Sequence, residues 1–164
     1  MEEEIKKEIR QWSTEVLEKS TDHFNGLPPC PYARRAFATK CVSIHVTDNL
    51  QTALDIKRQN PPRGQRVEVV AWTGYEKMTS DEFDEWLDKT NDPHEGTWVI
   101  GFHPDHPDDE AMEEFEGNGA PEYALILVQE YKHLVNASKQ LFKRGYYGNY
   151  SQEDKDYIKW RNNQ

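Results

Sequence analysis

The chain has 164 residues, a formal net charge of −10 and a mean hydropathy of −1.00. Such values are typical of disordered chains, but five Trp, eight Tyr and six Phe supply apolar surface that disordered chains usually lack. A chain of this length makes about one domain, so we expect a single folded domain over residues 1–164. The negative charge repels phosphate backbones and anionic lipids, so nucleic acid is not an expected partner and a basic protein is a better one.

The composition also predicts where the protein resides. No apolar run approaches the ~20 residues of a membrane-spanning helix, and the acidic start Met-Glu-Glu-Glu differs from the basic start of a secretory signal. Cys30 and Cys41 are the only cysteines, too few for a disulfide framework, although a bridge between the two remains open. We therefore expect a cytoplasmic protein with reduced thiols and no membrane association.

The first part of the chain predicts two helices followed by a strand. Apolar residues at helical spacing predict an amphipathic helix over residues 3–20. Pro31 is tolerated in a first helical turn, so Cys30 is the expected N-cap of a short helix that continues to Ala38. Residues 41–46 alternate between apolar side chains and the pair Ser43 and His45, which predicts a half-buried strand.

The middle of the chain predicts two helices, each preceded by a capping box. Asp48 with Gln51 is the expected box of the first, which ends before residue 60, and Thr79 with Glu82 is that of the second. A strand over residues 67–72 separates them. Nearly continuous apolar runs at residues 97–102 and 123–128 are expected to form the middle of the sheet.

The C-terminal part predicts a long helix from residue 131 to Gly145 and a short helix capped by Ser151. Helices and strands then alternate along the chain without an internal repeat. The expected fold is α/β, or α+β, with about four mostly parallel or mixed strands packed by helices in one domain.

The densest polar segment, residues 102–110, directly follows an expected buried strand. Ligands of α/β proteins collect beyond the carboxyl ends of strands. His103, Asp105 and His106 could therefore bind a divalent metal ion, with His45, Glu130 or His133 as a further ligand. The alternative is a solvated acidic loop stiffened by its prolines, with a short helix over residues 110–115.

Cys30 is the second candidate for chemistry. A thiol at a helix N-terminus, with Arg34 and Arg35 one turn further on, is expected to have a lowered pKa and to be reactive. Free cysteines are also among the most buried residue types, so a packed thiol in a proline-shaped loop is the alternative.

Two weaker patterns favour structural interpretations. Glu130 and His133 form one Glu-x-x-His pair, whereas a di-metal helix site needs two, so an exposed polar face is expected. Residues 143–150 alternate basic and aromatic side chains, a pattern that can stack single-stranded bases. The charge of the whole protein opposes that role, and we expect these tyrosines to pack against the core instead.

Three short motifs resemble an uncharacterised bacterial family. They are Pro29-Cys30-Pro31-Tyr32-Ala33, Phe102-His103-Pro104-Asp105 and the Leu-rich run 125–128 that closes on Gln129-Glu130. The resemblance marks Cys30, His103 and Asp105 as site candidates but implies no activity. The Tyr- and Asn-rich ending and the short acidic format are also similar to small bacteriophage proteins.

Two functional hypotheses follow. In the first, the protein is a small enzyme: Cys30, His103 and Asp105 are catalytic, a divalent metal ion assists, and Arg34 or Arg35 holds a small anionic substrate. In the second, it is an acidic accessory protein that binds a basic surface of a partner without catalysis. The similarity to bacteriophage proteins adds the hypothesis that a phage encodes it.

Overall fold

The computed structural model describes residues 1–106 and 121–164, which form a four-stranded mixed sheet packed by helices. The expected α/β class is therefore confirmed. Six helices are described: α1 (Glu2–Trp12), α2 (Ala33–Ala38), α3 (Gln51–Gln59), α4 (Ser80–Asn91), α6 (Tyr131–Lys143) and α7 (Gln152–Arg161). The strands are β1 (Val42–Thr47), β2 (Val67–Trp72), β3 (Thr97–Phe102) and β4 (Ala124–Glu130). No helix of this part of the chain is long and apolar enough to cross a membrane.

The strand order is β1-β2-β4-β3, with β1 parallel to β2 and with β4 antiparallel to both of its neighbours. Only one of the two runs expected in the middle is there: β4 is central, but β3 is an edge strand. The apolar character of β3 has another cause, because α4 packs against it and its first three residues are buried. The continuous apolar run of β3 therefore indicates that neighbouring elements cover the strand, and not that the strand is central in the sheet.

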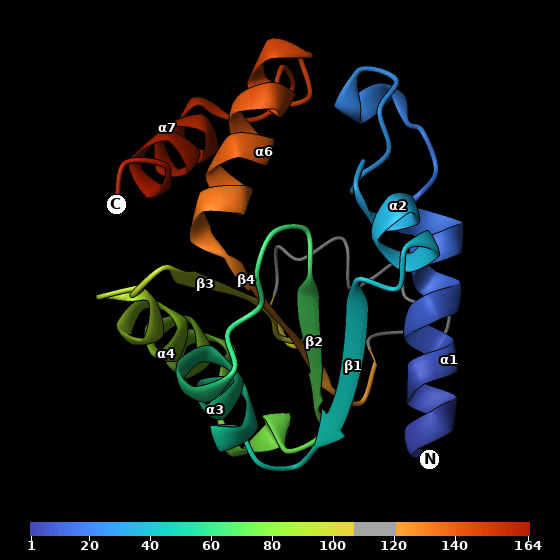
Figure 1. Cartoon of the computed structure of the whole chain (residues 1–164), viewed down its shortest axis with the longest axis vertical. Helices are drawn as coiled ribbons and strands as arrows, with labels where there is room; N and C mark the ends of the chain where they lie inside the picture. Colours follow the sequence, from blue (N-terminus) through green and yellow to red (C-terminus); the bar gives the residue numbers. More distant parts are fainter. Residues whose placement is uncertain (107–120) are drawn as a thin grey trace.

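Helices cover both faces of the sheet (Figure 1). On one face, Ile5, Ile9 and Trp12 of α1 pack against apolar side chains of β2 and β4. On the other face, Ala53 of α3 and Phe83 of α4 pack against a second set from β2, β3 and β4. Helix α1 thus presents the apolar stripe that the spacing predicted.

A third, smaller core lies beyond the sheet, in the upper part of Figure 1. There α6 and α7 meet the segment around residues 22–27, and Leu141 and Ile158 are buried with Tyr146 and Tyr147. The expectation that these tyrosines pack inward is confirmed. Buried rings are not available to stack nucleic-acid bases.

Two of the four predicted helix caps are confirmed, and two are wrong. Thr79 and Glu82 form the expected reciprocal capping box, and the Ser151 hydroxyl accepts from Asp154 N–H as expected. The box at Asp48 was wrong, because Asn49 Oδ1 accepts from Gln51 N–H at 2.9 Å in its place. The cap at Cys30 was also wrong, since α2 begins at Ala33 after Tyr32.

Gly101 allows β3 to approach α4 closely. A Cβ atom at this position would lie 2.6 Å from Phe83 Cε1 and 2.9 Å from Leu87 Cδ1, too close for either contact. Phe83 is fully buried and stacks between Trp72 and Trp86, so its ring has little room to move. This contact fixes how α4 lies against the sheet.

Replacing Gly101 with Ala is expected to lower the free energy of unfolding by ~1–3 kcal/mol because it overpacks the core. The same replacement in a Phe83→Leu background should cost less, because the smaller side chain leaves room for the methyl group. Urea denaturation of the four proteins measures this coupling. Equal losses in both backgrounds would contradict the contact.

Candidate functional site

His103, the main predicted catalytic residue, is buried directly after β3, with 1% of its surface exposed. Its Nδ1 accepts from Asp105 N–H at 3.2 Å, which places the proton on Nε2. Nε2 then donates to the carbonyl oxygens of Tyr75 and Met78, at 3.2 and 3.0 Å. Both ring nitrogens are thus engaged with backbone, and the ring fastens the turn at residues 75–78 to the end of β3.

The other residues of this segment are nearer the surface. Asp105 is exposed, and His106 Nε2 lies 3.4 Å from Asp84 Oδ2 of α4. Within the described ranges 1–106 and 121–164, no three His, Cys, Asp or Glu side chains are grouped so that they could hold a metal ion. The rest of the acidic segment, with the helix considered at residues 110–115, lies outside the described residues.

The three further ligand candidates are not hydrogen-bonded to His103. His45 Nε2 contacts Glu68 Oε2 at 2.8 Å, and Glu130 Oε2 accepts from Gly64 N–H at 2.6 Å. Glu130 is the last residue of β4. His103 follows the last residue of β3, which pairs with Leu125 near the start of β4. Glu130 and His103 therefore lie near opposite ends of β4. His133 lies on α6, which begins beyond that far end of β4.

Cys30 lies in the loop before α2, where its N–H donates to Leu17 O and its carbonyl accepts from Ala33 N–H. Burial raises the pKa of the Cys30 thiol, and the lowering by the Tyr32 and Ala33 amides is smaller. The expected lowered pKa was therefore wrong: α2 starts three residues later, so its N-terminal amides do not outweigh desolvation.

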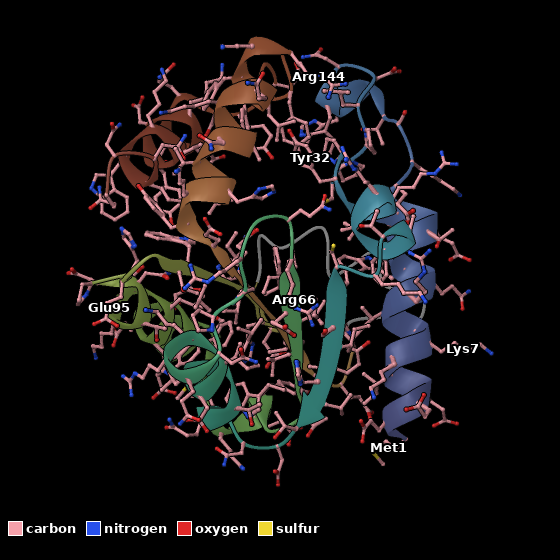
Figure 2. The ribbon with its side chains drawn as sticks, viewed as in Figure 1. Met1, Lys7, Tyr32, Arg66, Glu95 and Arg144 are labelled. Atoms are coloured by element: carbon pink, nitrogen blue, oxygen red, sulfur yellow. The ribbon has the colours of Figure 1, made fainter. Side chains whose placement is uncertain are left out.

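Cys30 and His103 lie at opposite ends of the sheet. The Cys30 loop is held near the start of β1, with Tyr146 O–H donating to Pro29 O, and Arg34 and Arg35 are exposed on α2 beside it. Figure 2 labels Tyr32 in this upper region. His103 instead contacts the turn after β2, at the carboxyl ends of β1 and β2. The structure brings His103 together with Asp105, but it places Cys30 at the other end of the sheet.

The carboxyl ends of the parallel strands do carry an open hollow of about 470 Å³. Lys77 Nζ and Trp72 Nε1 both donate to the Asp48 carbonyl there. Its lining consists of Asp48, Asn49, Leu50, Trp72, Lys77 and Met78. None of these is a histidine or cysteine, and the hollow contains none of the predicted catalytic residues Cys30, His103 and Asp105.

A polar cluster that the sequence analysis missed lies on the face of β1 and β2 that carries α3. It consists of Ser43, His45, Arg66 and Glu68, and we call it the β1 cluster. Glu68 is buried, and its two oxygens contact His45 Nε2 at 2.8 Å and Arg66 Nε at 2.9 Å. Arg66 Nη2 also donates to Ser43 Oγ at 2.7 Å. The signal in the sequence was Glu68, the one charged residue in the apolar strand 67–72.

A second missed feature is an acidic and aromatic surface on α4 and α7, here called the α4–α7 surface. Tyr157 and Trp160 are 50% and 55% exposed, and their ring centroids lie 5.7 Å apart. Its carboxylates on α4 are Asp81, Asp84, Glu85 and Asp88. Because α-helices repeat every 3.6 residues, these four share the side opposite Phe83.

The two helices of this surface are neighbours. Partial burial raises the pKa of the Tyr157 hydroxyl on α7, and Arg161 lowers it. The carboxylates of Asp88 and Asp84 on α4 also raise this pKa, which shows that they lie near Tyr157. Figure 1 shows α4 and α7 on the same side of the molecule, with α7 above α4. The exposed aromatic pair therefore borders the acidic stripe.

Comparison of the chain with protein-family models, with curated proteins and with solved structures gave no match. The resemblance to the uncharacterised bacterial family is not tested by these comparisons, so it stays a prediction from its three motifs.

The raised pKa of Cys30 predicts a slowly reacting thiol in the folded protein, because the thiolate is the nucleophile. In a Cys41→Ser background, iodoacetamide at about pH 8 should modify Cys30 at least about tenfold more slowly without urea than in denaturing urea. Mass spectrometry of the intact protein follows the reaction. Equal rates in the two conditions would show that Cys30 is an accessible, ionised thiol after all.

Proposed function

We propose that this protein is an acidic accessory protein that binds a basic surface of a partner protein through the α4–α7 surface. The observation that carries this proposal is the exposed pair Tyr157 and Trp160 beside the acidic stripe of α4. Tyr and Trp are the residues that most often anchor protein interfaces, and a large aromatic pair in solvent is unusual without a partner.

The charges of the surface support a basic partner. No ion pair between residues of the described ranges involves Asp81, Glu85 or Asp88, so their carboxylates are not neutralised by neighbouring cations. On α7, Glu153 and Asp156 add exposed carboxylates next to the aromatic pair. Such a field attracts and orients a positively charged surface, while the aromatic side chains supply apolar contact area.

The geometry gives less support to catalysis by Cys30, His103 and Asp105. A general base or metal ligand needs a free nitrogen lone pair, whereas both nitrogens of His103 are bonded to backbone groups. Cys30 lies at the other end of the sheet, and its pKa is raised. These contacts favour a structural role for His103 and Cys30 over a catalytic one.

The test compares capture of partners by matched charge variants. The double variant Glu85→Lys/Asp88→Lys changes the α4–α7 surface, and Glu3→Lys/Glu4→Lys makes the same change in net charge on the exposed start of α1. Each is immobilised with the wild type and with Trp160→Ala, and exposed to lysate of the cells that make the protein. Bound proteins are quantified by mass spectrometry at low salt and at about 0.5 M salt.

We expect one partner that the wild type and the α1 variant capture equally at low salt. The α4 variant and Trp160→Ala should lose at least about tenfold of it, and salt should weaken its capture. Circular dichroism checks that all four proteins are folded. Capture that is equal for the α1 and α4 variants, or no specific capture, would contradict the proposal.

A further inference from the structure

The β1 cluster holds an arginine and a histidine around one buried carboxylate. The side chain of Glu68 is 8% exposed, while those of His45 and Arg66 are 40% and 48% exposed. Glu68 therefore fixes the positions of both side chains from their buried side, and both keep part of their surface in solvent. Figure 2 labels Arg66 near the middle of the view, over β2.

Several hydrogen-bond donors of the cluster are left over. Arg66 uses Nε and Nη2, which leaves Nη1 without a partner in the described part of the chain. His45 uses only Nε2, so Nδ1 can donate outward when the ring is protonated. Ser43 Oγ accepts from Arg66 and keeps its own proton to donate. Ser43 and His45 lie two residues apart on β1, so they point to the same face.

We propose that Ser43, His45 and Arg66 bind the phosphate group of a small molecule on this face of the sheet. Three donors on one face, including a guanidinium, suit a tetrahedral oxyanion. With His45 protonated the cluster carries two positive charges and one negative charge, so it is a local exception to the acidic protein around it. A metal ion fits less well, because the cluster contains only His45 and Glu68 as ligand types for divalent metals.

Stability alone does not explain the buried carboxylate of Glu68. Buried carboxylates cost free energy to desolvate, and an apolar residue in place of Glu68 would serve stability as well. The carboxylate is explained if its role is to hold Arg66 and His45 in position for a ligand. This site is independent of the α4–α7 surface, since β1 and the strand that packs on α4 are at opposite edges of the sheet.

Nuclear magnetic resonance titration tests the site. The ¹⁵N-labelled protein at about pH 6, where an ordinary histidine is largely protonated, is titrated with inorganic phosphate and, separately, with glycerol 3-phosphate. Sodium chloride at matched ionic strength is the control. We expect saturable shifts at residues 43–45 and 66–68 with phosphate and not with chloride, and the tighter of the two probes distinguishes a free anion from a monoester.

Variants distinguish phosphate binding at this site from nonspecific binding of phosphate to positively charged side chains. Arg66→Gln is expected to weaken phosphate binding at least about tenfold, since a charged hydrogen-bond donor is lost. Arg34→Gln, which removes the same charge from exposed α2, should leave it unchanged. Because Arg66→Gln could unfold the protein by removing one of the two partners of Glu68, Ser43→Ala is a second variant. It keeps both contacts of Glu68 and should weaken binding about fivefold. Chemical shifts that do not saturate with phosphate would overturn the proposal. Equal phosphate affinities of the Arg34 and Ser43 variants would also overturn it.

Discussion

The arrangement of this protein depends on the pairing of β4 with both β2 and β3. Ile126 and Val128 are fully buried at its centre, and its antiparallel direction sets what each end of the sheet carries. The start of β4 lies at the same end of the sheet as the carboxyl ends of β1 and β2, where the His103 ring holds the turn after β2. At its other end it continues directly into α6, which leads to α7 and the third core. Cys30 and His103 are separated by the length of the strands for this reason.

Much of the fold followed from local sequence. The capping box at Thr79, the alternation around His45 and the stripe of α1 each depend on residues within a few positions of one another, so the sequence predicts them well. The position of β3 depends on which strands pair, which is a property of contacts distant in sequence. Its apolar run fits an edge strand covered by α4 as well as it fits a central strand, so the pattern could not separate the two.

The candidate site was harder to predict, because chemical roles depend on what each side chain meets. His103 follows a buried strand, as a catalytic residue often does, but the turn at residues 75–78 supplies carbonyls for its Nε2. Cys30 precedes a short helix, but desolvation governs its thiol. Glu68 and the pair Tyr157 and Trp160 left traces in the sequence: a charge within an apolar strand, and aromatic residues three apart on a polar helix. These traces concern exposure and burial, and the structure supplies both.

Photocrosslinking tests directly whether the α4–α7 surface meets a partner protein. A benzophenone amino acid replaces Glu153, which is exposed on α7, or, for comparison, Glu3 on the exposed start of α1, and the cells that make the protein are irradiated. We expect a crosslinked partner from position 153 that is absent from position 3 and is lost when Glu85 and Asp88 are changed to lysine. If the two positions gave the same adducts, or position 153 gave none, the α4–α7 surface would not be the binding surface.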